Sequence, residues 1–179
     1  MAAPKYTLVA LVEDKPGVLN RVASLFRRRG FNIQSLAVGP TEQPGLSRMT
    51  IVVGGVGAQV EQVRKQLEKL VDVVKVYDIS GDSLVARELA LIRVRATPQN
   101  RAEIIQIVDV FRANIVDVAP DSVVVEVTGD EDKIESLINL LRGFTIRELA
   151  RTGRIAMTRG VSGPLLVEEE KAPKKEKRG

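Results

Sequence analysis

The sequence predicts an α+β protein of two βαββαβ units in tandem, each an antiparallel sheet with helices on one face. Three observations predict this fold class. Apolar residues alternate with strand and helix periods, and the order of these segments repeats after about eighty residues. Glycine and proline mark the boundaries between segments. Apolar residues make up 44% of the chain but aromatic residues only 3%, so Val, Ile and Leu must fill the cores.

The first unit is expected over residues 5–80. A buried strand over 6–12 leads into a Pro-Gly turn, and a helix over 16–29 then carries an apolar stripe on one face. Gly30 is expected to be the C-cap of this helix. The remaining segments are a strand over 32–38, a turn over 39–45, a strand over 48–53, a helix over 58–70 and a strand over 71–79.

The second unit is expected over residues 84–160, after a break at 81–83. Its segments are a strand over 88–96, a helix over 98–112, strands over 115–118 and 123–128, a helix over 130–141, and a strand over 144–150 with a short extension to 158. Two such repeats are best explained as two ferredoxin-like domains. A charged tail over 164–179 has nothing to bury, and we expect it to be disordered and solubilising.

The residue types present restrict the chemistry available to this chain. It has no histidine and no cysteine, which excludes Ser-His-Asp and Cys-His nucleophiles, Cys or His zinc sites, iron–sulfur clusters and disulfides. The net charge is +4, but only two Tyr and four Phe could stack on bases, so we expect no nucleic acid partner. No window is long enough to span a bilayer, so we expect no membrane partner and a cytoplasmic location.

The main functional pattern is the turn between the first strand and the first helix, over residues 14–17. In one interpretation this is an ordinary helix start, capped by Asp14, in which Gly17 is merely tolerated. In the other, N–H groups around Gly17, Val18 and Leu19 hold the carboxylate of an amino acid, and the glycine gives it room. The local sequence supports both interpretations equally.

A family resemblance favours the ligand site. The turn, followed by Gly30-Phe31-Asn32-Ile33-Gln34-Ser35-Leu36, resembles the amino-acid-sensing end of an ACT domain. With the segments 46–51 (Leu-Ser-Arg-Met-Thr-Ile) and 66–73 (Gln-Leu-Glu-Lys-Leu-Val-Asp-Val), the chain resembles the small regulatory subunit of acetolactate synthase, from about residue 5 to about residue 160.

The resemblance implies a non-catalytic regulatory subunit that pairs into a homodimer through its ACT domains. It would bind valine, or else leucine or isoleucine, activate the large catalytic subunit and confer feedback inhibition. No cofactor is expected in this chain; thiamine diphosphate, Mg²⁺ and FAD are expected in the large subunit. The alternative is an ACT-type binding module that regulates a different enzyme or a transcription regulator.

The implied effector site lies on the turn, the first helix and the second strand: Asp14, Gly17, Val18, Leu19, Asn32, Ile33 and Leu36. Asn32 would reach across the dimer interface to the ligand of the partner chain. The side chain of the effector would lie against Val18, Ile33 and Leu36. The second unit has Ala-Thr-Pro-Gln-Asn at 96–100 in place of this turn, so sensing is expected only in the first.

One residue departs from the family pattern. Many members carry asparagine where this chain has Asp14. An ionised aspartate only accepts hydrogen bonds, so it could hold the ammonium group of the effector but would repel its carboxylate. Two other patterns have ordinary explanations. The glycines over 54–57 are expected to form a flexible turn rather than a phosphate loop. The arginines over 27–29 are expected to be a solvated helix end rather than a nucleic-acid patch. Those at 147, 151, 154 and 159 are expected to be surface charge, with partner docking as the alternative.

Overall fold

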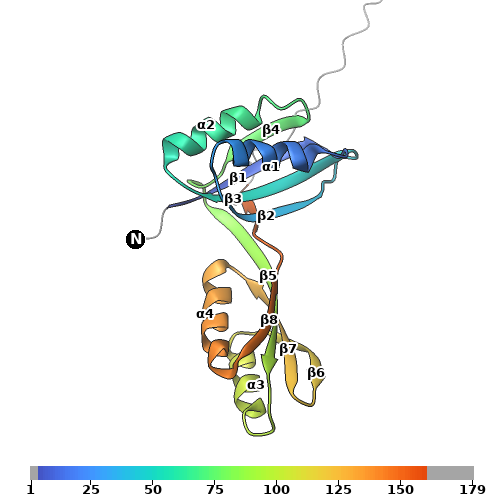
Figure 1. The fold of residues 1–179 in the computed structure, drawn as a ribbon, viewed down its shortest axis with the longest axis vertical. Helices are drawn as coiled ribbons and strands as arrows, with labels where there is room; N and C mark the ends of the chain where they lie inside the picture. Colours follow the sequence, from blue (N-terminus) through green and yellow to red (C-terminus); the bar gives the residue numbers. More distant parts are fainter. Residues whose placement is uncertain (1–3, 161–179) are drawn as a thin grey trace, which may run out of the picture.

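The structure is a computed structural model that describes residues 4–160, and it contains two βαββαβ domains, one above the other in Figure 1. The elements of the first domain are β1 (Lys5–Glu13), α1 (Val18–Arg28), β2 (Ile33–Pro40), β3 (Leu46–Gly54), α2 (Gly57–Leu67) and β4 (Val73–Asp78). Its four strands are antiparallel neighbours in the order β2-β3-β1-β4. The predicted fold class is confirmed, whereas the tail predicted over 164–179 lies outside the described residues.

Helices α1 and α2 cover one face of the first sheet (Figure 1). Alternate residues of β1 point toward these helices, and the same face of β3 supplies Met49, Ile51 and Val53 to the same core. On the helices, apolar residues at three- and four-residue spacing complete this core, as the sequence predicts: Val22, Leu25 and Phe26 on α1, and Val60, Val63 and Leu67 on α2.

The second domain repeats this arrangement. Its elements are β5 (Leu84–Arg95), α3 (Arg101–Val110), β6 (Asn114–Ala119), β7 (Ser122–Gly129), α4 (Glu131–Leu141), the 3₁₀ turn η1 (Arg142–Phe144) and β8 (Ile146–Arg151). The strand order is β6-β7-β5-β8, again antiparallel. The side chain of Asp130 caps α4 by accepting a hydrogen bond from the Lys133 N–H at 2.9 Å.

A two-stranded ribbon connects the domains. The first four residues of β5, Leu84–Arg87, pair with a last strand, β9 (Ile155–Thr158), and the rest of β5 enters the second sheet. The ribbon packs on the face of the first sheet that the helices leave open, where Ala156 joins Val9 and Ile79 in a small buried cluster. Consequently β1 is buried on both faces.

The structure corrects the predicted starts of two elements, β5 and α1. The break predicted at 81–83 is a turn, but β5 begins at Leu84 rather than at 88, because its first residues find a partner in β9. Helix α1 begins at Val18 rather than at 16. Its C-cap is Arg29, and Gly30 is the following residue, with φ 71°, while the Phe31 N–H closes the end on the Phe26 carbonyl at 3.0 Å.

Within residues 4–160, none of the helices combines the length and the apolar content that a membrane span requires.

Candidate functional site

The start of α1 is an open turn. Gly17 is the N-cap and has φ 87°, a left-handed backbone conformation that residues other than glycine adopt only with strain. The Val18 N–H reaches the Lys15 carbonyl only at 3.4 Å. The N–H groups of Gly17 and Leu19 form no hydrogen bond within the described part of the chain. The turn therefore presents backbone donors to solvent at the positive end of a helix.

Asp14 does not cap this helix. No side chain accepts a hydrogen bond from the start of α1, so the interpretation of an ordinary capped start is wrong. Asp14 is exposed, and its own N–H donates to the Gly45 carbonyl at 2.8 Å, which ties the turn to the β2–β3 connection. Its carboxylate is thus free to meet a ligand.

Two cations flank the turn. Arg21 lies one helical turn after Gly17, and a methyl group built on Gly17 would lie 3.9 Å from Arg21 Nη2. Arg21 Nε lies 2.6 Å from Oδ2 of Asp72, a carboxylate only 6% exposed, in a geometry that makes the contact an ion pair rather than a hydrogen bond. On the other side, the hydrogen bond with the Glu13 carboxylate raises the pKa of Lys15. Arg21 is not among the site residues predicted from the sequence, although residues four apart in a helix share a face and its spacing from Gly17 places it beside the turn.

The predicted apolar residues come from β2 and from the start of α1. A β-bulge between Ile33 and Ser35 lets Ile33 and Leu36 share the helix-facing side of the sheet, where both pack partly buried on the core. Val18 is 3% exposed, so its side chain is already part of that core, whereas Leu19 is 47% exposed. Val18 and Leu19 thus lie at the turn, whereas Ile33 lies toward the other end of β2, and Ile33 and Leu36 form an apolar wall along that strand.

Asn32 lies away from the turn in its own chain. It is exposed and precedes the first residue of β2, next to the C-terminal end of α1. The Gly17 turn lies at the other end of that helix, beside the β2–β3 connection through the bond from Asp14 to Gly45. Within one chain, Asn32 and Gly17 are not brought together.

The second domain closes the corresponding turn. After β5, the Asn100 side-chain oxygen accepts from the Thr97 N–H at 2.7 Å, and the N–H groups of Asn100 and Arg101 donate to the Thr97 carbonyl at 3.2 and 3.0 Å. Arg101 extends its guanidinium to the carbonyls of Ala119 and Pro120. The N–H of the N-cap residue, which is free at Gly17 of α1, thus has an internal acceptor at Asn100 of α3.

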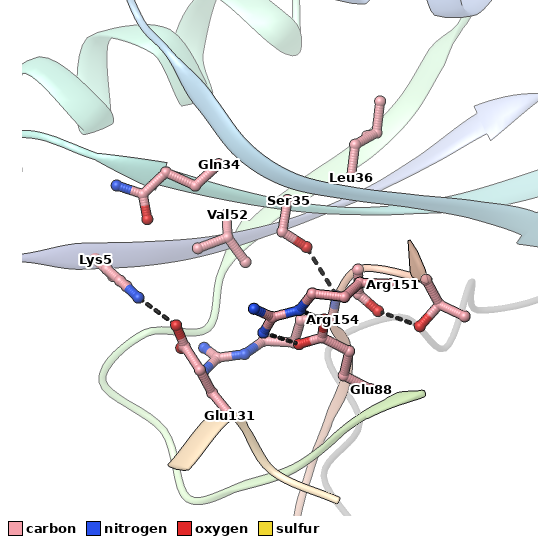
Figure 2. A pocket seen from close by; sticks show the side chains of 11 residues that line it. Lys5, Gln34, Ser35, Leu36, Val52, Glu88, Glu131, Arg151 and Arg154 are labelled. Carbon is pink, nitrogen blue, oxygen red and sulfur yellow. Dashed lines mark hydrogen bonds and ion pairs between the residues drawn. The ribbon is translucent and has the colours of Figure 1, made fainter. Parts of the chain in front are cut away.

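A cavity of about 440 Å³ with many charged lining residues lies between the two domains (Figure 2). Glu88 is 8% exposed and is held by two bonds from Arg151, of which Nη2 to Oε2 measures 3.0 Å. Glu131 bonds both Lys5 and Arg154, and the hydrogen bond from Lys5 lowers the pKa of Glu131. The charged side chains that line this cavity are thus paired with one another.

Three of the four arginines expected to be surface charge, Arg147, Arg151 and Arg159, are exposed, as predicted, whereas Arg154 is half-buried. Arg151 and Arg154 pair in the cavity, Arg147 pairs with Asp121 at 2.8 Å, and Arg159 donates to the Leu84 carbonyl. They attach the end of the second domain to β1, β5 and α4. Partners distant in sequence cannot be read from spacing, so no local signal indicates these pairs.

Two further patterns carry no ligand site of their own. Among the described residues there is no group of three or more Asp, Glu, His or Cys side chains able to hold a metal ion. At the turn over 54–57, a methyl group on Gly57 would lie 3.0 Å from the Tyr6 hydroxyl, which gives this glycine a packing role.

Comparison with known proteins assigns each half of the chain to a family. Residues 8–75 match the model described as the AHAS small subunit-like ACT domain. Residues 87–160 match the model described as the small subunit of acetolactate synthase.

Full-length relatives agree with these matches. A protein of Archaeoglobus fulgidus named "Probable acetolactate synthase small subunit" is 60% identical over 156 residues, which cover 87% of this chain and 98% of the relative. The acetolactate synthase small subunit of Mycolicibacterium smegmatis is 53% identical over 160 residues, 89% of this chain and 94% of the relative. The crystal structure of the acetolactate synthase small subunit from Thermotoga maritima superimposes with a TM-score of 0.82 at 45% identity, covering 89% of this chain and 99% of that one.

Proposed function

Because this chain belongs to the acetolactate synthase small-subunit family, we propose that it senses valine and passes the signal to the catalytic subunit. The resemblance drawn from the residues is thereby confirmed, and the family implies a catalytic-subunit partner. In the proposal the chain itself is non-catalytic and acts in the cytoplasm. It raises the activity of the catalytic subunit when bound, and valine reverses that effect.

The observation that carries the proposal is the open start of α1. The unpaired N–H groups at Gly17 and Leu19, the positive end of the helix and the Arg21 guanidinium together suit an α-carboxylate. The apolar wall formed by Leu36 and Ile33 suits an aliphatic side chain. A branched-chain amino acid has both chemical features, so the site supports valine, with leucine or isoleucine as close alternatives.

The direction of β2 supports a site completed by a second copy. β2 and β1 are both antiparallel to β3, so they run the same way, and β2 ends on the side of the sheet where Gly17 lies. Asn32 is at the opposite end, about 20 Å away along the strand. If β2 pairs antiparallel with β2 of a partner, the partner's Asn32 comes to the Gly17 end.

The two edges of the first sheet differ in a way that favours pairing through β2. β4 carries the charged residues Lys75 and Asp78, which discourage strand addition. β2 has the sequence Ile-Gln-Ser-Leu-Ala-Val-Gly-Pro, without any charge. On its helix-facing side Val38 is 47% exposed, as is Leu19 of the neighbouring helix. These groups form the proposed dimer surface.

In this proposal the cofactors belong to the partner. The large subunit carries thiamine diphosphate, Mg²⁺ and FAD and joins two 2-oxo acids with loss of CO₂. Valine inhibits by binding one state of the complex better than the other, a preference of typically about 1–3 kcal/mol in allosteric systems.

The proposal is tested by mixing the purified chain with the large subunit and measuring acetolactate formation from pyruvate. We expect no product from this chain alone with all cofactors added, a higher rate for the mixture, and a fall of that rate with valine. Calorimetry should detect valine binding to the chain without its partner. Catalysis by the isolated chain, or a partner rate that it does not raise, would overturn the proposal and favour an ACT-type module for another enzyme or a transcription regulator.

A further inference from the structure

The segment that connects β8 to β9 makes an unusually close crossing over β2. We call Thr152, Gly153 and Arg154 the joint. The Arg154 N–H donates to the Ser35 hydroxyl oxygen at 2.7 Å. A methyl group built on Gly153 would lie 2.9 Å from Ser35 Oγ and 3.1 Å from the Leu36 carbonyl oxygen, and Gly153 has φ 82°. Both the conformation and the close approach therefore require glycine here.

The two faces of β2 thus serve different purposes. Ser35 and Leu36 are consecutive, and Figure 2 shows Ser35 pointing into the cavity and Leu36 pointing away from it. Leu36 belongs to the proposed effector wall, whereas Ser35 touches the joint. A displacement of β2 by a ligand on one face must change the contact on the other, because close-packed backbone leaves no slack to absorb it.

From the joint, hydrogen bonds lead into the second domain. Thr152 exchanges bonds with Leu89 of β5, its N–H donating at 3.0 Å and its hydroxyl oxygen accepting at 3.1 Å. The Arg154 guanidinium bonds Glu131, the first residue of α4, at 3.1 Å and also Thr7 of β1 at 3.3 Å. The joint therefore touches β2 on one side and both β5 and α4 on the other.

From this geometry we propose that the joint couples effector binding to the position of the second domain. Ser35 and Gly153 are positioning residues: they transmit the displacement of β2 and make no contact with the effector. This inference rests on the proposed function, since it requires an effector beside Leu36. It assigns the ACT domain the role of sensor and the second domain the role of the part that moves.

The sharpest test is Ser35→Ala, which removes the acceptor of the Arg154 N–H without altering the effector face. In the complex with the large subunit, we expect activation to be unchanged and saturating valine to leave most of the activity, where it removes most in the wild type. Calorimetric affinity of the isolated chain for valine should stay within about threefold. Gly153→Ala, which pushes the joint off β2, should uncouple in the same way.

A matched control is Asn100→Ala. It removes a bond of the same kind and length, from a backbone N–H to a side-chain oxygen at 2.7 Å, but in the second domain and away from the joint. Valine inhibition of this variant should be that of the wild type. Equal inhibition of Ser35→Ala and wild type would overturn the coupling, and so would an equal loss of inhibition in Asn100→Ala.

A direct readout of domain position does not depend on catalysis. Because the chain has no cysteine, spin labels can be placed at two positions only, such as the exposed Lys69 and Gln106, after α2 and on α3. We expect valine to shift the distance distribution between the labels in the wild type but not in Ser35→Ala. Valine binding without any shift overturns the coupling alone, whereas no valine binding to the wild type overturns the proposed function as well.

Discussion

The two domains share one fold, but their first helices begin differently. At α1 the turn contains a left-handed glycine, and N–H groups remain without partners in the described chain. At α3 the Asn100 side chain and the Thr97 carbonyl close the same position. The difference shows that the ability to hold an anion depends on a few residues of one turn and not on the βαββαβ fold.

The open faces of the two sheets also differ. In the first domain the ribbon of β5 and β9 covers the face away from the helices, and Val9 is fully buried. In the second domain Leu91, on the corresponding face of the sheet, is 39% exposed. The second domain therefore keeps a sheet face free while its end is anchored to the first. This arrangement fits a sensor in the first domain and a contact or moving part in the second.

The largest effect is expected from Gly17→Asp. A side chain at φ 87° is strained, and its carboxylate would stand where the effector carboxylate is expected. The concentration of valine that half-inhibits the complex should rise at least about a hundredfold, equivalent to about 3 kcal/mol, with activation retained. Gln99→Asp, in the corresponding turn just before the N-cap of α3, should leave inhibition unchanged in the same assay.

Strain and charge at this position can be separated with Gly17→Ala. It carries the same backbone penalty, about 1–2 kcal/mol, but no charge, so inhibition should weaken by no more than about thirtyfold. Full loss of inhibition in the alanine variant would show that the turn acts through its conformation. Wild-type inhibition in Gly17→Asp would place the effector elsewhere.

Local patterns were sufficient for most of the fold and for the turn, but not for the contacts between domains. The uninterrupted apolar run over 8–12 predicts β1 as a buried strand, because such a run is recognised from neighbours in sequence alone. The ribbon was missed, since Leu84–Arg87 become a strand only by pairing with residues some seventy positions later. Ser35 and Arg154 are 119 residues apart, and no spacing rule relates them.

At the candidate site, residue type predicted the place but not the geometry. The sequence indicates that Gly17 needs room, whereas the structure adds a positive φ and removes Asp14 as a cap. The i to i+4 spacing from Gly17 could have indicated Arg21, but its ion pair with Asp72, the residue before β4, joins positions far apart in sequence and leaves no local signal. The roles in effector binding of all seven predicted residues stay predictions: Asp14, Gly17, Val18, Leu19, Asn32, Ile33 and Leu36.

Ion pairs at the domain junction should contribute more to the free energy of unfolding than ion pairs on the surface of the first domain. Glu88→Gln leaves Arg151 facing a neutral group inside the cavity, and because Arg151 is partly exposed we expect a loss of about 1–3 kcal/mol in the free energy of unfolding. Glu61→Gln breaks an exposed pair with Arg64 on α2 and should not shift the denaturation midpoint measurably. If both variants unfold at the same urea concentration, the predicted difference between the buried and the exposed ion pair is wrong.

A smaller, pH-dependent effect is expected at Glu131. Its neighbours Lys5, Arg154 and Arg151 hold its pKa below the unfolded value of 4.5. The ionised group therefore stabilises the folded state above about pH 4.5, and this contribution disappears as the pH falls through the lower, folded pKa. Glu131→Gln should thus be less stable than wild type at pH 7, by up to about 1 kcal/mol, and equal to it well below pH 4.

The control for Glu131 is Asp132→Asn, on the same first turn of α4 but without an ion pair in the described part of the chain. Both variants lose a favourable charge at the helix start, so the difference between them isolates the contacts with Lys5 and Arg154. Denaturation curves at pH 3 and pH 7 measure it. A gap between Glu131→Gln and wild type that persists at pH 3 would mean that the side chain stabilises through its shape.

A small effect on effector binding is expected from Asp14→Asn. The Asp14 carboxylate is exposed and does not cap α1, so its only electrostatic partner at the turn would be the effector itself. Removing the negative charge removes repulsion of the effector carboxylate, and the amide adds a donor. Because water screens an exposed site, the gain should be about 1 kcal/mol, or about fivefold tighter valine binding.

Calorimetry of both proteins at neutral pH decides between two orientations of the ligand. Tighter binding means that position 14 faces the carboxylate, whereas weaker binding means that Asp14 holds the ammonium group and that the open N–H groups of α1 receive the carboxylate without its interference.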